Sequence, residues 1–333
     1  MTFINTDKSC KFCAEVSKNN GEDPIGSARK YKQFLLIQAS LPWSDGIWLK
    51  EGSMPKEVIN ALQVAWDNGI NFRPLAIASD EKNPLSHQIR VLSFCRPTSL
   101  FAIFERKEYL IPPAKLANLV TALLSQPEQL SLFQPYEQNT DSIRDLLICT
   151  HGSHDISCGR FGYPIYKKLK QDYEKYNLRI WRCSHFGGHQ FAPTLIDLPT
   201  GHYWGHLEPN ILDVLIHRQG SVAKLRSHYR GWAGLDWAEQ IAEREIWIKE
   251  GWDWLTYLKS GETLAISDSE ADYPDWAEVK INFCKPDGSE RGVYEARIEA
   301  HTEVETMWNS GDPDSIETIK QYHVTRLIKS SCK

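Results

Sequence analysis

The sequence predicts an α/β protein with a C-terminal extension, because apolar runs of strand length alternate with helical patterns and tryptophans gather late in the chain. We place an N-terminal α/β domain at residues 1–140 and a second α/β domain at residues 141–220. A Trp-rich helical and β extension follows at residues 221–333. With 41% hydrophobic and 24% charged residues the composition is globular, so a buried core is expected.

Regular structure in the first domain is expected to begin after a polar stretch at residues 1–28, whose glycines and proline interrupt helices and strands. After this stretch, runs typical of strands and helices alternate. The expected strands lie at residues 33–39, 89–95 and 100–106, and the expected helices at residues 55–68 and 114–125.

The second domain is predicted to follow the order strand, helix, strand, hairpin and helix, which is a thioredoxin-like order. A helix is expected at residues 162–176, with Pro164 in its first turn, where a missing amide proton costs little. In the extension we interpret the tryptophans between Trp232 and Trp254 as core packing. The other elements expected after residue 140 are strands at 145–148 and 178–183, a hairpin at 194–204, and a strand pair at 278–283 and 292–298.

Two cysteines and two histidines with regular spacing form the strongest chemical signal: Cys149-x8-Cys158-x26-His185-x3-His189. Each lies where a strand ends or a helix is expected to begin, and such loops meet at one edge of an α/β domain. Thiolate and imidazole ligands together suit either zinc or a two-iron two-sulfur (2Fe-2S) cluster. Gly187 lies between the histidines, and with its glycine neighbour it allows a tight turn and close approach to a metal centre.

The residues around these ligands resemble the sucrase/ferredoxin-like family, and more narrowly its bis-histidinyl branch, at residues 149–152, 158–162 and 184–193. Weaker similarity reaches residues 13–26 and 230–254. The resemblance implies a thioredoxin-like domain carrying a 2Fe-2S cluster. It further implies an electron carrier, or the electron-transfer part of an oxidoreductase, which we expect to act with a redox protein partner. Its implied cluster ligands are Cys149, Cys158, His185 and His189.

The sequence leaves several alternatives to this function and to this set of ligands. A zinc-stabilised interaction module without redox activity is the alternative function, because spacing alone does not separate zinc from iron and sulfur. Cys183 is an alternative ligand, since it precedes His185 by two residues. His151 and His154 are expected around the site or on the surface. Arg160 is expected either to balance cluster charge or to be a plain surface residue.

The pair Cys10-x2-Cys13 has the spacing of a redox dithiol or half a zinc site. Because it lies in a polar segment without a second pair nearby, we expect no metal or disulfide role for it. The alternative is a thiol relay or an auxiliary site near the cluster.

Charge and motif content exclude several other functions. The net charge of -5 and the lack of a basic block argue against nucleic-acid partners. No apolar run is long enough to cross a bilayer, and the N-terminus lacks a secretory pattern, so a cytoplasmic protein without membrane contact is expected. In that compartment eight cysteines are better explained as ligands or free thiols than as disulfides. No acidic pair marks a glycoside hydrolase, and no phosphate-binding loop is present.

Overall fold

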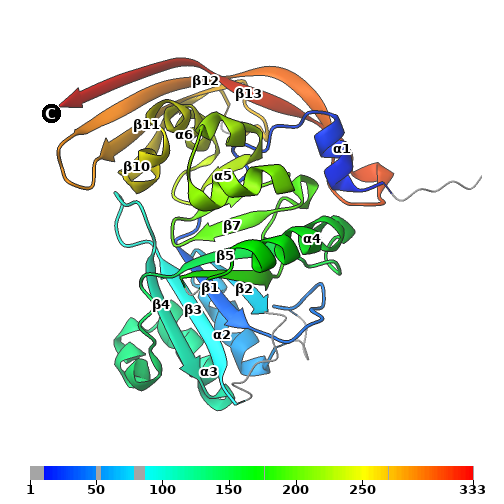
Figure 1. The fold of residues 1–333 in the computed structure, drawn as a ribbon, viewed down its shortest axis with the longest axis vertical. Helices are drawn as coiled ribbons and strands as arrows, with labels where there is room; N and C mark the ends of the chain where they lie inside the picture. The colour runs from blue at the N-terminus through cyan, green and yellow to red at the C-terminus, as the bar shows by residue number, and fades with distance from the viewer. Residues whose placement is uncertain (1–10, 50–53, 79–86, 176, 269, 333) are drawn as a thin grey trace, which may run out of the picture.

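A computed structural model describes residues 11–49, 54–78, 87–175, 177–268 and 270–332. Within them the strands form one nine-stranded sheet and one four-stranded antiparallel sheet, with helices packed on both (Figure 1). This confirms the predicted α/β fold class. The larger sheet takes strands from all three predicted segments, whose boundaries at residues 140 and 220 stay a prediction.

Two parallel strand pairs organise the larger sheet. The strands β1 and β2 are joined through helix α2 (Lys56–Asp67), and β5 and β6 through helix α4 (Ile156–Tyr173). A helical crossover is the usual way to join parallel neighbours. In sheet order the strands are β4 (Glu105–Ile111), β3 (Ile89–Cys95), β1 (Gln33–Gln38), β2 (Phe72–Ala78), β6 (Leu178–Cys183), β5 (Arg144–Cys149), β7 (Leu195–Leu198), β8 (His202–Trp204) and β9 (Tyr229–Trp232).

The larger sheet is buried on both faces. Along β1, Phe34 and Leu36 belong to one hydrophobic cluster, and Leu35 and Ile37 to another. Side chains on a strand alternate between faces, so a strand covered on both sides is apolar throughout. The second cluster includes side chains from α2 and from α3 (Leu116–Leu124), which therefore cover one face of the N-terminal half.

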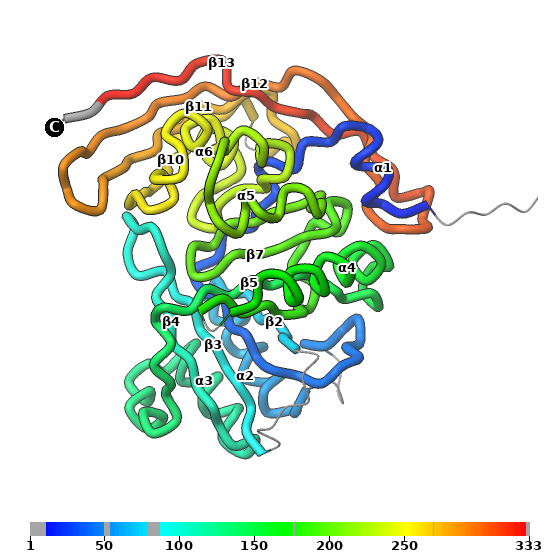
Figure 2. The backbone as a smooth tube through the Cα atoms, viewed as in Figure 1, coloured from blue at the N-terminus to red at the C-terminus, as the bar shows by residue number. Residues whose placement is uncertain are grey.

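The smaller sheet packs against α6 (Trp237–Glu250), and its last two strands extend to the N-terminal helix α1 (Cys13–Asn19). Figure 2 shows the turn between these strands beside α1, although the two are almost 300 residues apart. The backbone of Gly311 in this turn donates to the carbonyl of Lys11 over 2.9 Å. The strands are β10 (Leu258–Ile266), β11 (Trp276–Cys284), β12 (Arg291–Met307) and β13 (Ile316–Cys332), and the remaining α-helix is α5 (Leu212–His217).

Most expected elements are confirmed within a few residues, including the hairpin at β7 and β8 and the pairing of β11 with β12. Trp232, Trp247 and Trp254 are fully buried, as expected of core residues. The strand expected at residues 100–106 is wrong. Phe101 and Phe104 there pack against each other, and Phe101 against Trp232, so their apolar character serves the core rather than a strand.

Two further expectations about boundaries are corrected. Residues 1–28 were expected to lack regular structure, but α1 lies within them. Helix α4 begins at Ile156 and not near residue 162, because the carboxylate of Asp155 accepts from the amide of Ser157 and caps the helix. Pro164 therefore lies inside the helix and not in its first turn. In the described part of the chain, no helix is both long and apolar enough to span a membrane.

A buried ionic network connects the edge strand β4 to β5 and β6. Glu108 accepts two hydrogen bonds from Arg179, over 3.0 and 2.9 Å, and one from Arg106 over 2.7 Å. Arg179 and Arg106 also pair with Asp145 on β5. Burial alone would raise the pKa of Glu108, but the hydrogen bonds and charge of Arg179 lower it to about 2. The carboxylate therefore stabilises the folded protein in its charged form.

We expect the free energy of unfolding to fall as the pH drops from about 4.5 toward 2, because over that range the unfolded chain protonates Glu108 before the folded protein does. The lowered pKa corresponds to roughly 3 kcal/mol. Urea unfolding of the wild-type and Glu108→Gln proteins across this pH range measures the change in unfolding free energy. The variant should be less stable at neutral pH, since Arg90, Arg106 and Arg179 lose their carboxylate, and its stability should depend less on pH. Parallel pH profiles would contradict this assignment.

Candidate metal centre

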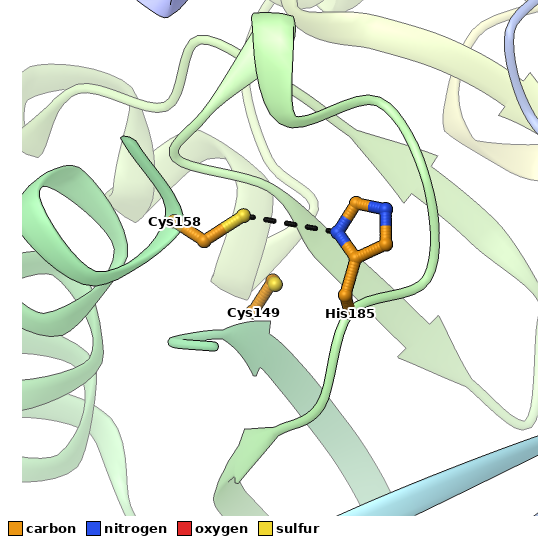
Figure 3. Close-up of side chains that lie close together, drawn as sticks. All are labelled: Cys149, Cys158 and His185. Atoms are coloured by element: carbon orange, nitrogen blue, oxygen red, sulfur yellow. Dashed lines mark hydrogen bonds between the residues drawn. The ribbon is translucent and has the colours of Figure 1, made fainter. Parts of the chain in front are cut away.

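The thiols of Cys149 and Cys158 meet at the end of β5. Cys149 is the last residue of the strand and Cys158 lies in the first turn of α4, and each is only 1% exposed. Cys158 was expected just before a helix start, and the earlier start of α4 puts it inside the helix instead. Figure 3 shows both sulfur atoms and the ring of His185 facing a common centre. These three donor atoms lie within 4.8 Å of one another.

Close packing of α4 on β5 produces this meeting of thiols. Gly162 faces the end of the strand, where a Cβ atom would lie 2.0 Å from the carbonyl oxygen of Cys149. Gly159 lies against Gly152 of the preceding loop, and an added Cβ would be 3.0 Å from the Cα of Gly152. Only residues without a side chain permit these contacts. The glycines that follow the second cysteine thus set the distance between the thiols.

The two thiols influence each other's protonation. Burial raises the pKa of Cys149, but the interaction with Cys158, a backbone hydrogen bond at His151 and the charges of His189 and Arg73 together lower that pKa below its ordinary value. The interaction with Cys149, together with burial, raises the pKa of Cys158. A positively charged metal centre would displace the thiol protons, because thiolates and not thiols are the ligands.

His185 follows β6 and completes the group of three donors. Its Nδ1 lies 3.8 Å from the sulfur of Cys158, and its Nε2 accepts from the amide of Gly187 over 3.0 Å. The ring of His154 stacks on it with centroids 3.8 Å apart. Burial lowers the pKa of His185, and the nearby His154 and His189 lower it further. The ring is therefore neutral at neutral pH, as metal coordination requires.

His189 lies beside His185 but belongs to a different group of donors. One group of donor atoms within 4.8 Å joins His154, His185 and His189, and another joins Cys13, Asp155 and His189. The four predicted ligands thus occupy two overlapping groups that share His185. The ring centroids of His185 and His189 are 5.3 Å apart. A short 3₁₀ helix, η3 (His189–Phe191), begins at this histidine.

Cys13 lies at the site, although we expected no metal or disulfide role for it because it lies in a polar segment. It is fully buried, and its sulfur is 3.4 Å from Nδ1 of His189. This agrees with the weaker reading of an auxiliary thiol near the site. The sequence signals for it were the Cys10-x2-Cys13 spacing and the similarity at residues 13–26. Cys10 lies outside the described residues.

Asp155 is the residue that the sequence reasoning assigned least well. It was considered as a carboxylate that orients His154, but its Oδ2 lies 3.2 Å from Nδ1 of His189. His154 pairs instead with Asp45 over 2.7 Å. Burial alone would lower the pKa of His189, but the hydrogen bond with Asp155 and contact with Cys13 raise it to about 9.

Two other candidates lie away from the donor groups. Cys183 is fully buried and pairs with Cys149 in the β5–β6 register, and none of the donor groups found among the described residues includes it. Arg160 is exposed on α4. The buried cation near the thiols is Arg230, which is 1% exposed and donates to the carbonyl of Gly187 over 2.9 Å. Burial lowers the pKa of Arg230 to about 10, so it keeps its charge at neutral pH.

The histidine side of the site opens into a pocket of about 670 Å³. Its lining joins His185 and His189 to Arg230 and to aromatic residues from α6 and β13, Trp237 and Tyr322. The rings of these two aromatic residues lie 5.1 Å apart. The thiol side is buried beneath α4, so the pocket provides access to the histidines.

The two loop glycines differ in what a side chain would meet. At Gly188 (φ 75°) a Cβ atom would lie 2.2 Å from Nη2 of Arg230, whereas at Gly187 (φ 97°) it would meet nothing within 4 Å. We expect both substitutions by alanine to cost about 1 kcal/mol for the left-handed backbone. Gly188→Ala should cost roughly 1–3 kcal/mol more, because Arg230 must move. Urea unfolding of both variants measures the difference in stability. Equal losses of unfolding free energy would show that Arg230 moves aside without cost.

The sequence was also compared with known proteins. The profile of the family described as "Sucrase/ferredoxin-like" matches residues 24–231, more than half of the chain. A protein of Meyerozyma guilliermondii named "Altered inheritance of mitochondria protein 32" is 24% identical over 156 residues, which cover 38% of this chain and 54% of that relative. The match thus spans about half the length of that relative. No solved structure matches the chain. The extent of the family match shows that this chain belongs to the sucrase/ferredoxin-like family.

Proposed function

We propose that this protein transfers electrons through a 2Fe-2S cluster bound by Cys149, Cys158, His185 and His189. The observation that carries the proposal is the convergence of three of these donors, two buried thiols and a neutral imidazole, within 4.8 Å. The fourth, His189, stands next to His185. Family membership supports the same reading.

The donor set fits such a cluster chemically. Two thiolates and two imidazoles are the ligands of Rieske-type 2Fe-2S centres, in which imidazole replaces thiolate on one iron. When bound, the cluster would accept and release one electron. Cys149 and Cys158 would hold one iron and the two histidines the other. Exchanging two thiolates for neutral rings raises the reduction potential, by several hundred millivolts in the Rieske class.

The surrounding residues would limit the cost of burying charge. Cys158 lies in the first turn of α4, and a helix N-terminus stabilises negative charge. Arg230 contributes a buried positive charge near both thiols. We propose that a redox protein exchanges electrons at the histidine side, where the pocket reaches both rings. The cytosol is our proposed compartment, because thiolate ligands need a reducing environment.

A zinc-stabilised module without redox activity is the second candidate. It is favoured by the compactness of the Cys149, Cys158 and His185 group, since three donors within 4.8 Å also suit a single tetrahedral ion. His189 would then supply the fourth ligand. The two proposals differ in metal, colour and magnetic properties.

Metal content separates the two candidates. Protein purified without oxygen should be red-brown, with iron and acid-labile sulfide each near two per chain, and should give an electron paramagnetic resonance (EPR) signal when reduced. Cys149→Ala should abolish these features, while Cys284→Ala, far from the site, should keep them. Colourless protein with one zinc per chain would establish the second candidate. A full native spectrum in Cys149→Ala would contradict the ligand assignment.

Replacing one histidine by cysteine tests the histidine ligands. In His189→Cys we expect a cluster with a lower reduction potential, because a thiolate adds negative charge to the centre. Voltammetry of the purified variant and the wild-type protein measures the shift. His217→Cys is a matched control on the exposed end of α5 and should leave the potential unchanged. An unchanged potential in His189→Cys would remove His189 from the ligand set.

A further inference from the structure

Three segments that are distant in the sequence contribute residues to the surroundings of Nδ1 of His189. Helix α1 contributes Cys13, the start of α4 contributes Asp155, and the turn after β12 contributes Ser310. The hydroxyl of Ser310 donates to the carboxylate of Asp155 over 2.8 Å and lies 3.2 Å from the sulfur of Cys13. Cys13 and Ser310 both fall outside residues 24–231, so the segments flanking the family match complete this arrangement.

The hydrogen bonds of Asp155 fix the direction of its contact with His189. Its Oδ1 accepts from the amide of Ser157 over 2.7 Å, and its Oδ2 accepts from the amide of Ser310 over 2.9 Å. The same Oδ2 lies 3.2 Å from Nδ1 of His189. An ionised carboxylate can only accept, so Nδ1 must be the donor. Asp155 also accepts from the hydroxyl of Ser310 over 2.8 Å, so both of its oxygens act as acceptors toward protein donors.

We propose that Asp155 is a positioning residue that keeps a proton on Nδ1 of His189 and thereby leaves Nε2 as the atom that binds the metal centre. The second half of this statement rests on the proposed function; the first half does not. A metal-binding histidine commonly donates its other ring N–H to a carboxylate, which fixes the tautomer and the ring orientation. Ser310 holds the carboxylate, and Cys13 packs against the same nitrogen.

The two histidines are therefore held in different ways. Nε2 of His185 accepts from the amide of Gly187, and its Nδ1 faces Cys158. No carboxylate contacts the ring of His185 within the part of the chain that the structure describes. The carboxylate at His189 increases the basicity of that ring alone. The segments that hold Asp155 thus act on one ligand of the pair.

Asp155→Asn reverses the hydrogen bond without removing the helix cap. Asparagine caps helices as well as aspartate does, and its Oδ1 can still accept from Ser157. Its amide nitrogen would take the place of Oδ2 and can only donate, so the amide of Ser310 would lose its acceptor, Nδ1 of His189 would have to accept, and the proton would move to Nε2. Asp45→Asn is a matched control, because Asp45 contacts His154 and not His189.

Nitrogen-15 NMR of the metal-free full-length chain tests the tautomer directly. The spectra are recorded at increasing alkaline pH until the ring is neutral. We expect an Nδ1–H ring in the wild-type and Asp45→Asn proteins and an Nε2–H ring in Asp155→Asn. An Nε2–H ring in the wild-type protein would overturn the inference. This measurement needs no cluster, so it stands whether or not the proposed function holds.

The metal-loaded protein tests the consequence. If iron and sulfide are present, Asp155→Asn should lose iron to a chelator about 10–100-fold faster than the wild type, the size of effect usual for such a partner of a metal-binding histidine. Its EPR spectrum should also change, which a merely structural role would not cause in the surviving cluster. Wild-type iron retention and an unchanged spectrum in Asp155→Asn would overturn the second half of the inference.

Discussion

The close approach of α4 to the end of β5 is the constraint on which the site depends. Gly162 lies against the carbonyl of Cys149, where no side chain fits, and this contact brings Cys158 opposite the strand end. Burial of both thiols follows from the same contact, since helix and strand leave no room for water between them. Protein interiors pack at the density of organic crystals. Adding even one methyl group at this contact would therefore push α4 away from β5 and separate the two sulfur atoms.

Buried charge is the second constraint, and each buried charge in the centre of the protein has a partner. Glu108 and Asp145 face Arg106 and Arg179, and Glu108 also pairs with Arg90. Arg230 lies near the thiols, and its guanidinium donates to the carbonyl of Gly187. An unpaired buried charge would cost several kcal/mol. Arg230 therefore favours a thiolate over a thiol at the two cysteines.

The sequence predicted the fold class and the donors that lie closest together, because spacing and strand ends are local signals. The positions of most helices and strands could also be predicted. The exceptions are segments whose residues also make contacts outside their own helix or strand. Residues 100–106 have an apolar strand-like pattern, but Phe101 is packed into the core against Trp232. The helix was expected to begin at residue 162, and it begins at Ile156, so Gly159 also belongs to α4, where the helix packs closely on a strand.

Contacts between the ends of the chain could not be predicted from local patterns. Cys13 and Ser310 are 297 residues apart and meet only because the long β12–β13 hairpin reaches α1. Asp155 caps α4, and the sequence did not indicate that its second oxygen would face His189. Helix capping and ligand orientation use different oxygens of one carboxylate. Local sequence can indicate that a residue caps a helix. Its contact with a metal-binding histidine becomes visible only in the three-dimensional structure.

The two sides of the site differ in how they are built, and this difference has a functional consequence. The thiol side depends on α4 and β5, which are neighbours in the sequence and pack tightly. The histidine side depends on α1 and the β12–β13 turn, which lie at opposite ends of the chain, and it faces a pocket. Local opening has a lower free energy where fewer buried contacts hold a segment. Movement of the terminal segments would therefore alter the surroundings of His189 before it disturbed the thiols of Cys149 and Cys158.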